Sequence, residues 1–551
     1  MKGKLFTRKA KTLILFFLFL WLLVFGRLFY LQVLRTEEIS KKTQEKQVRL
    51  LPIESRRGSI LDTKGRILAT DLKMFTLYAR KSEIKNPGVI AKKLADHSLG
   101  SEERLFELLK DDAEFIRIAR GISDSAVDKI KVDGVYAVKE WYRFYPSGLI
   151  GRTVLGSLDW KRFGILGIEK EYDEMLKGED GWAHFLEVPR YSGISLLKRL
   201  ENEHKDPSEG YDVCLTIDID IQSIIHEELE SVKKKTGADQ VMGICVSVKT
   251  GEILAMVNFP EFDPNKGWRL NACTSWEFEP GSVFKLIPAF AYISRGFSIS
   301  DVLVDSTSIE FGGKLFKDGH PHPAYTFEEA LINSSNVGFI AVGEKIGKKD
   351  LYNTARLFGI GCESGIDLPV EYSGKLPHLP KGRDIRLATV SFGQGVSVTP
   401  LQMVMAYQAV ANDGVLLRPR VMKSIYKNNK IVKRSKKEII RRIGNSKSCN
   451  ILLDILHSTA EEGTGTGATI SLVSIAGKTG TAWKVKDGKY VKGKYVSSFI
   501  GVFPYPEPEF ILGIFVDNIG SPYYASETAC PAFREIIRRI VTHSGYRERF
   551  L

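Results

Sequence analysis

Hydrophobic and polar residues follow three distinct patterns along the 551-residue chain. The first is an apolar run over residues 13–26 that resumes after the single charge of Arg27. A helix over 12–34 would be about 34 Å long at 1.5 Å per residue, which is enough to cross the hydrocarbon core of a bilayer. No second apolar run reaches this length, so the sequence predicts a single transmembrane helix over 12–34.

The residues before this run predict its orientation. Residues 1–11 carry several lysines and arginines, and by the positive-inside rule such a tail stays in the cytoplasm. The rest of the chain is then expected on the extracytoplasmic side. A cleaved signal peptide is the alternative, and it is disfavoured because the apolar stretch is long and no A-x-A-like site follows it.

The second pattern, over 35–205, combines short amphipathic segments with many turns. "RRGSILDTKGRILA" at 56–69 is typical of strand, turn and strand, and "GIEKEYDEMLKGEDG" at 167–181 is typical of an amphipathic helix that ends at Lys-Gly. The polar stretch at 201–210 contains the Pro and Gly expected of a domain boundary. Because no catalytic constellation is found, we expect a pedestal or dimerisation-type domain over 35–205.

The third pattern, over 206–551, places strands at both ends and long helices between them. "QVMGICVSVKTGEILAMVN" at 240–258 predicts a β-hairpin, and strands return at 474–483, 495–503 and 510–517. A closing amphipathic helix carries Phe533, Ile536, Ile537 and Ile540 on one face. The pattern predicts an α+β domain with one central antiparallel sheet flanked by helices, in which strands from the two ends of the domain meet.

Composition narrows the class of protein. Hydrophobic content of 43% and charged content of 26% are those of a globular protein. The net charge of +13 suits an anionic neighbourhood such as a membrane surface or cell-wall polymer, or simply a basic surface. No nucleic-acid-binding module is found. The six cysteines contain no CxxC pair, so neither a zinc site nor a disulfide scaffold is expected, and His320 and His322 are expected in a loop rather than at a metal.

The first candidate for chemistry is the stretch "FEPGSVFKLIPAFAYI" at 278–293. Ser282 and Lys285 are three residues apart, so a helical turn would place the amine beside the hydroxyl. A lysine in an apolar pocket has a lowered pKa and can take the proton of a serine nucleophile. Pro288 predicts a kink further along the same helix. A capping serine with an exposed lysine is the plain alternative for this segment alone.

Two further motifs strengthen this interpretation. "NSSNVG" provides a hydroxyl and an amide at Ser334 and Asn336. "SIAGKTGTAW" at 474–483 resembles the lysine end of a phosphate-binding P-loop, but Leu472 stands where that loop needs glycine. The segment instead predicts a strand on which Lys478 and Gly480 share one face and Thr479 and Thr481 share the other. Gly480 is expected to leave room for a ligand along the strand edge, and a small twist would bring both faces to bear on it.

The three motifs in this order resemble those of the penicillin-binding proteins and serine β-lactamases. S-x-x-K, S-x-N and K-T-G are separated by 334 − 282 = 52 and 478 − 334 = 144 residues, spacings that suit the family. "YRFYPSG", "GIEKEYD", "TGEILAMVNFPEFDPN", "SFGQGVSVTPLQ" and "GTGTGA" extend the resemblance to nearly the whole chain. They resemble the pedestal and transpeptidase domain of class B penicillin-binding proteins, and Glu279 is more similar to the cell-division branch than to the elongation branch.

The resemblance implies roles for the motif residues. Ser282 would be acylated by the D-Ala-D-Ala end of a peptidoglycan stem peptide, with Lys285 as the base. Ser334 would relay the proton, and Asn336 would orient Lys285 and the substrate amide. The backbone N–H groups of Ser282 and Thr481 would form the oxyanion hole. The substrate carboxylate would bind Lys478, Thr479, Gly480 and Thr481, and no metal or cofactor would be needed.

The resemblance also implies a setting: a single-pass protein of the bacterial cytoplasmic membrane with an extracytoplasmic catalytic domain. Its expected partners are stem peptides, a membrane-embedded glycan polymerase, other membrane proteins of the division complex, and β-lactam antibiotics as inhibitors. An elongation-type transpeptidase and a largely non-catalytic scaffold for wall synthesis are the alternatives. A β-lactamase or a β-lactam sensor fits less well, because the chain is long, anchored and has only eleven residues before its span.

Overall fold

The computed structural model divides the chain into two compact units, described separately below. One comprises Met1–Arg56 and Gly178–Glu209, and the other Arg57–Lys177 and Gly210–Leu551. The expected loop at His320 and His322 lies outside the described residues. The structure describes residues 2–35, 48–130, 132, 134–189, 195–261, 270–318, 324–378, 384–486, 489–519 and 524–550.

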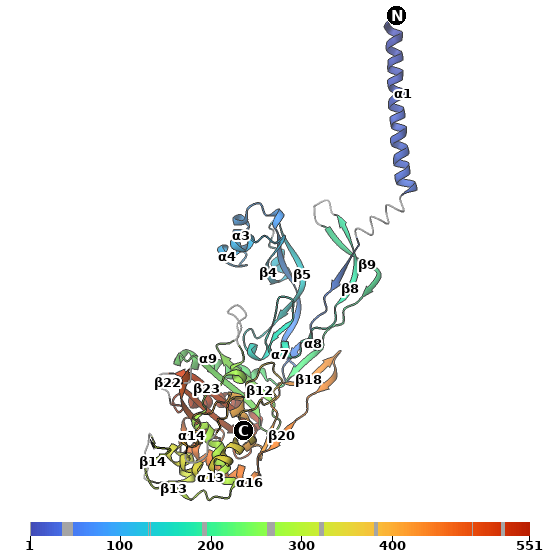
Figure 1. The fold of residues 1–551 in the computed structure, drawn as a ribbon. Coiled ribbons are helices and arrows are strands. Elements are labelled where there is room, and N and C mark those ends of the chain that lie inside the picture. Colours follow the sequence, from blue (N-terminus) through green and yellow to red (C-terminus); the bar gives the residue numbers. More distant parts are fainter. Residues whose placement is uncertain are drawn as a thin grey trace. The chain divides into compact units, whose positions relative to one another are not determined.

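The first unit contains the predicted membrane helix. Helix α1 (Lys2–Phe29) continues into a π-helical turn, η1 (Tyr30–Leu34), as one long rod (Figure 1). Within the described chain, one helix, over Ala10–Leu34, is long and apolar enough to cross a membrane, with a mean hydropathy of 2.4. The unit also holds an antiparallel sheet in which β8 (Gly181–Pro189) pairs with β1 (Val48–Ile53) and with β9 (Ser195–Lys205).

The second unit begins with the strand–turn–strand predicted at 56–69. β2 (Ile60–Leu61) and β3 (Ile67–Arg80) are joined by a turn in which Asp62 Oδ1 accepts hydrogen bonds from the backbone N–H groups of Lys64 and Arg66, at 2.9 and 2.8 Å. Gly65 has a φ of +83°, a conformation that favours glycine. The prediction for this segment is confirmed.

A sheet extends from this turn in both directions. β3 pairs with β4 (Phe115–Ile122) and β5 (Val135–Phe144), and α3 (Pro87–Asp96) and α4 (Glu102–Leu109) pack on it through Leu94 and Leu105. On the other side, β2 pairs in parallel with β10 (Asp212–Leu215). β10 then pairs with β18 (Met422–Lys427), which pairs with β19 (Lys430–Arg434). The pedestal strands therefore continue into the C-terminal domain.

Buried charges join three segments that are distant in sequence. Arg57 is 1% exposed, and its Nε lies 2.7 Å from Glu169 Oε2. Arg143 Nε lies 2.7 Å from Glu169 Oε1, and Arg143 Nη1 lies 3.2 Å from Asp71 Oδ1. Burial raises the pKa of the Glu169 carboxyl, but the two guanidinium groups outweigh burial and hold that pKa below its usual value. Removing one partner would leave a buried charge uncompensated.

The C-terminal domain is built around the predicted antiparallel sheet. The strands follow the order β12 (Ile253–Phe259), β11 (Gln240–Ser247), β23 (Phe510–Ile519), β22 (Lys489–Phe503) and β21 (Ala476–Lys486) among the described residues. β11 pairs with β23 from Gln240↔Asp517 to Ser247↔Phe510, so strands from the two ends of the domain meet as predicted. β21 is at the edge of this sheet.

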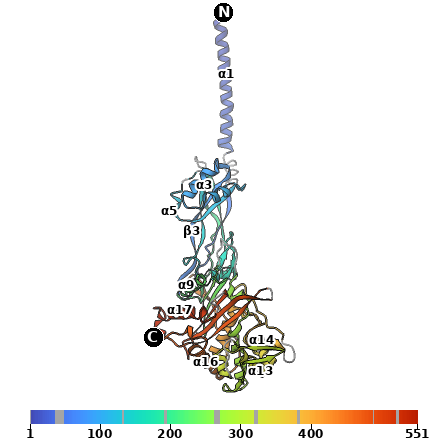
Figure 2. The same cartoon turned by 90° about the vertical axis from the view of Figure 1, so that its left-hand side faces the viewer.

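Helices cover both faces of the sheet (Figure 2). On one face, α9 (Ile219–Thr236) packs on β11 and β12, and α17 (Ala529–Thr542) packs on β22 and β23. Phe533, Ile536, Ile537 and Ile540 are all buried, which confirms the predicted face of the closing helix. On the other face, α15 (Pro400–Ala411) and α16 (Ser446–Glu461) pack on the sheet, and α11 (Leu286–Ser294) packs on α16 and on α13 (Asn336–Leu357).

Candidate active site

The candidate nucleophile lies on a tight turn packed against the edge strand. Gly281–Lys285 is a 3₁₀-helix that leads directly into α11. In a 3₁₀-helix residues three apart are eclipsed, so Ser282 and Lys285 lie on the same side. Gly281 has a φ of +57°, and a Cβ there would lie 3.0 Å from Thr481 O. Glycine therefore allows the turn to approach β21 closely.

The predicted kink at Pro288 is not needed. The α-helix begins at Leu286, after the 3₁₀ turn, so Pro288 falls in its first turn rather than in its interior. The missing N–H of proline costs little in a first turn, because the N–H groups there have no α-helical acceptor. The expectation of a kink was wrong because it assumed one continuous α-helix.

Lys285 is fully buried and connects two of the predicted motifs. Its Nζ donates to Ser334 O at 2.5 Å and to Asn336 Oδ1 at 2.9 Å, and lies 3.3 Å from Ser334 Oγ. Burial lowers the pKa of the amine well below its usual value, and the nearby charge of Lys478 lowers it further. The structure thus brings S-x-x-K and S-x-N together around one amine.

The loop that carries Ser334 has a constrained backbone. Ser334 lies between α12 (Phe327–Ile332) and α13 and has a φ of +59°, which is uncommon for a residue other than glycine. The next residue, Ser335, caps α13 by accepting a hydrogen bond from the N–H of Gly338 at 2.8 Å. This left-handed turn lets Ser334 O face Lys285 while α13 begins directly at Asn336.

Asp318 supports this loop, and the sequence analysis missed it. Its Oδ1 accepts from the N–H groups of Asn336 and Val337, at 2.7 and 3.2 Å, and its Oδ2 accepts from Ser335 Oγ at 2.5 Å. A carboxylate at a helix N-terminus is favoured by the free N–H groups and the helix dipole. Asp318 also raises the pKa of Lys285, partly opposing burial. No local pattern marks this residue, since it lies 18 positions from Asn336.

The K-T-G lysine is also buried. Lys478 Nζ lies 3.4 Å from Thr464 Oγ1 and 3.5 Å from Thr479 Oγ1, and these two hydroxyls are 2.6 Å apart. Burial lowers the pKa of Lys478 to about 7. Thr464 belongs to the "GTGTGA" segment, which pointed to the family but to no individual residue.

Gly480 has a different role from the one expected. A Cβ at this position would lie 2.4 Å from Ser498 Oγ, 3.0 Å from Val283 Cγ1 and 3.1 Å from Pro280 O. The space is therefore occupied by the neighbouring strand and by the turn that carries Ser282, not left open for a ligand. The sequence analysis expected glycine here, but for the wrong reason. The alternation of residues along the strand does not show that the turn carrying Ser282 packs on this face.

These elements border one open cleft of about 420 Å³. Ser282 is half-buried at its wall, and Thr479 and Thr481 project into it from the opposite face of β21 to Gly480. Such a volume suits a peptide-sized ligand. No cluster of potential metal ligands is found among the described residues. The cleft is lined by Ser282, Asp318, Tyr325, Asn333, Ser334, Ser335, Asn336, Gly463, Thr464, Thr466, Thr479, Thr481, Tyr524, Ala525 and Ser526.

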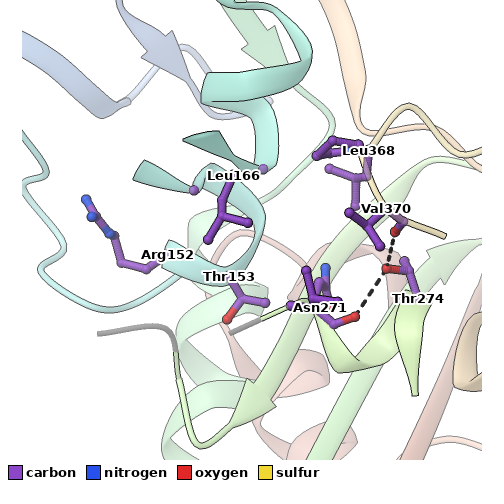
Figure 3. A pocket seen from close by; sticks show the side chains of 11 residues that line it. Arg152, Thr153, Leu166, Asn271, Thr274, Leu368 and Val370 are labelled. Atoms are coloured by element: carbon purple, nitrogen blue, oxygen red, sulfur yellow. Dashed lines mark hydrogen bonds between the residues drawn. The ribbon is translucent and has the colours of Figure 1, made fainter. Parts of the chain in front are cut away.

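A small pocket of about 20 Å³ lies apart from this cleft (Figure 3). The Thr274 hydroxyl on its wall donates to Val370 O at 2.8 Å and lies 3.2 Å from Asn271 O. The volume is that of about one water molecule. The Thr274 hydroxyl is therefore already hydrogen-bonded within the wall.

Comparison with known proteins agrees with this geometry. The Penicillin binding protein transpeptidase domain matches residues 241–538, and the Penicillin-binding Protein dimerisation domain matches residues 52–215. Stage V sporulation protein D of Bacillus subtilis is 33% identical, covering 97% of this chain and 86% of that protein. Peptidoglycan D,D-transpeptidase FtsI of Escherichia coli K12 is 28% identical, covering 93% of this chain and 88% of that protein.

A solved structure has the same fold. Penicillin binding protein 3 from Mycobacterium tuberculosis, complexed with aztreonam, has a TM-score of 0.69 and 27% identity, covering 91% of this chain and 97% of that one. The chain belongs to the penicillin-binding protein family. Within that family it is a class B protein of the division branch, as its sequence motifs predicted.

Proposed function

We propose that this protein is a division-type peptidoglycan D,D-transpeptidase that works through an acyl-serine intermediate at Ser282. The observation that carries the proposal is the environment of Lys285. A neutral lysine amine has two N–H donors and one lone pair, and the bonds to Ser334 O and Asn336 Oδ1 use both donors. The lone pair can then accept a hydroxyl proton, from Ser282 in the proposed step or from Ser334, whose Oγ lies 3.3 Å from the amine. The lowered pKa of Lys285 favours this neutral form.

In the first half-reaction, Ser282 Oγ attacks the penultimate D-Ala carbonyl of a stem peptide and its proton passes to Lys285. The tetrahedral intermediate collapses, the C–N bond to the terminal D-Ala breaks, and the proton goes by way of Ser334 to the leaving amine. The products are an ester at Ser282 and free D-alanine. General base catalysis of this kind contributes about 10²–10⁴-fold to rate.

The edge of β21 supports an oxyanion hole at Thr481. In an extended strand the N–H and C=O of one residue point to the same side. A Cβ added at Gly281 would lie 3.0 Å from Thr481 O, so the side of β21 to which the Thr481 N–H and C=O point faces the nucleophile turn. Its N–H and that of Ser282 would together bind the developing oxyanion, a type of contact worth about 3–4 kcal/mol.

The substrate carboxylate would bind beside Lys478, Thr479 and Thr481. Lys478 is poised for this because its ammonium reaches Thr479 Oγ1, whose side chain lines the cleft. A bound carboxylate stabilises the protonated form of the lysine, so ligand binding would raise the Lys478 pKa from about 7.

In the second half-reaction, an amine of a neighbouring stem peptide attacks the ester and gives a 4→3 crosslink. The amine loses a proton, and Ser282 Oγ regains one through Lys285. β-Lactams resemble the donor and would acylate the same serine. The second half-reaction would then not free Ser282 from the acyl group. The related penicillin binding protein 3 from Mycobacterium tuberculosis has been crystallised with both aztreonam and ampicillin.

The cellular setting follows from the anchor and the family. Helix α1 would hold the protein in the cytoplasmic membrane as a single span, with residues 1–11 in the cytoplasm and the catalytic domain outside. The partners would be a membrane-embedded glycan polymerase and other membrane proteins of the division complex.

Reconstitution of the crosslinking reaction tests this function. Full-length protein in detergent micelles is mixed with a donor pentapeptide ending in D-Ala-D-Ala and an acceptor tripeptide bearing a free side-chain amine. We expect one D-alanine released for each crosslinked product, and neither product with Ser282→Ala. D-Alanine release with hydrolysed donor only, in the presence of saturating acceptor, would assign a carboxypeptidase or β-lactamase-like enzyme instead.

A further inference from the structure

Glu279 lies three residues before Ser282, and the sequence analysis gave it no role in the reaction. Its carboxylate is partly buried, and Oε1 accepts a hydrogen bond from the backbone N–H of Gly395 at 2.9 Å. Oε2 accepts one from the Tyr490 hydroxyl at 3.2 Å. Gly395 lies in the loop after α14 (Ile385–Ser391), and Tyr490 lies at the start of β22. One side chain therefore links the nucleophile turn to two segments that are 116 and 211 positions away in sequence.

The loop that contains Gly395 packs directly on the nucleophile turn. The N–H of Gly281 donates to Gly393 O at 3.0 Å. Gly393 has a φ of +84°, and a Cβ there would lie 2.1 Å from Gly281 O, so only glycine allows this approach. The bond from Gly395 to Glu279 adds a second attachment further along the same loop. The loop and the turn are therefore fixed to each other at two points.

The bond to Tyr490 ties the same turn to the edge strand. Tyr490 pairs with Val485 of β21, further along the strand from Thr481. The N–H groups of Ser282 and Thr481 are the proposed donors to the oxyanion, so the two donors belong to the two segments that this bond connects. Neither Glu279 nor Tyr490 is among the described residues that line the catalytic cleft. The connection therefore acts on the geometry of the donors without touching the substrate.

The contacts of Glu279 depend on hydrogen bonding rather than on an opposite charge. The N–H of Gly395 and the hydroxyl of Tyr490 are both neutral donors. Burial raises the pKa of the Glu279 carboxyl, and these two hydrogen bonds oppose that rise. Glutamine could keep both contacts, because its oxygen can accept from Gly395 and its amide N–H can donate to the Tyr490 oxygen. Alanine keeps neither, so the two substitutions separate the effect of the bonds from that of the charge.

We infer that Glu279 is a positioning residue, which sets the separation between the N–H groups of Ser282 and Thr481. The inference rests on the proposed function, in which these two groups bind the oxyanion. The oxyanion forms only as Ser282 attacks, whereas the carboxylate contacts around Lys478 form when the ligand first binds. Loss of Glu279 should therefore slow acylation and leave the affinity of the initial complex unchanged.

The kinetics of acylation test this inference. Rapid-quench measurements on full-length protein in detergent micelles, at several concentrations of penicillin G, give the acylation rate constant and the Kd of the initial complex. For Glu279→Ala we expect the rate constant to fall by about 100-fold and the Kd to stay within about threefold of the wild type. Glu279→Gln should keep the rate constant within about threefold of the wild type, because both contacts survive. Tyr490→Phe keeps the bond to Gly395 and should lose about tenfold.

Glu277→Ala is the matched control. Glu277 accepts a hydrogen bond from the N–H of Gly374, at 3.1 Å, and Gly374 lies in a different loop, so this variant should be acylated as the wild type is. If Glu279→Ala does not fold, Tyr490→Phe decides the test, because Tyr490 is 54% exposed and loses only its hydroxyl. A wild-type rate constant for Tyr490→Phe then overturns the inference.

Three results with folded Glu279→Ala would also overturn it. These are an unchanged rate constant, a loss that appears in the Kd alone, and an equal loss of rate in Glu279→Gln. Failure of the proposed function gives a different result, since folded wild-type protein would then not be acylated at all.

Discussion

Lys285 Nζ donates a 2.9 Å hydrogen bond to Asn336 Oδ1, and this contact joins the nucleophile turn to the start of α13. The two residues are 51 positions apart, and both come from short motifs that carry little information alone. The bond also orients the amine, because the amide oxygen accepts a hydrogen bond without adding a negative charge. The neutral partner is therefore compatible with a neutral lysine.

The charge of this partner can be tested with Asn336→Asp. A carboxylate beside Lys285 would stabilise the protonated amine and raise its pKa from the lowered value of the wild type. We expect acylation by penicillin at pH 7 to fall by about 100-fold and the acidic limb of its pH–rate profile to move to higher pH. A uniform loss at all pH values, with no shift of the limb, would mean that the amide acts only through packing.

Asp318→Asn tests the support beneath the loop. The substitution removes the carboxylate charge that accepts hydrogen bonds from the N–H groups of Asn336 and Val337. We therefore expect a loss of roughly 1–3 kcal/mol in the free energy of unfolding. Asp318 raises the pKa of Lys285, so its neutralisation should move the acidic limb of acylation to lower pH. Thermal unfolding and the pH–rate profile measure the two effects separately, and a limb that moves upward would contradict this assignment.

Gly480→Ala tests the close approach of strand and turn. The new methyl group would lie 2.4 Å from Ser498 Oγ and close to Val283 and Pro280, which displaces the turn carrying Ser282. We expect at least about a 100-fold loss of acylation in a protein that still folds. Gly88→Ala is the matched control, since a Cβ there meets no atom closer than 3.5 Å. Wild-type acylation by Gly480→Ala would show that the turn has room to move.

Lys478→Met tests whether function costs stability here. The folded pKa is about 7 and the ordinary value is 10.5, so the unfolded chain holds the proton more tightly. The buried lysine therefore lowers the free energy of unfolding. This destabilisation is complete below pH 7 and disappears as the pH rises towards 10.5. Methionine removes it, so we expect the free energy of unfolding at pH 7 to rise by roughly 1–4 kcal/mol while acylation is lost. A variant less stable than the wild type at pH 7 would contradict this.

The sequence predicted the elements whose information is local. An unbroken apolar run identified the membrane helix, and alternation identified β21 and β22. The buried face of α17 was correct because residues three and four positions apart specify it. The motif residues Ser282, Lys285, Ser334 and Asn336 do come together as the family resemblance implied. Their assigned roles remain predictions for the experiments above.

What could not be predicted depends on contacts between distant segments. Asp318 and Thr464 have no local pattern, and they matter only because the fold places them beside Asn336 and Lys478. The reason for Gly480 was misread because the packing partner of its face lies nearly 200 residues earlier, in the turn around Pro280.

The most direct test of the central claim is intact mass spectrometry of the full-length protein after reaction with penicillin G, followed by peptide mapping. The account predicts one adduct of the intact drug mass, located on Ser282, stable over the time of purification and absent from Ser282→Ala. An adduct on another residue, or none on folded wild-type protein, would contradict an acyl-serine mechanism at this site.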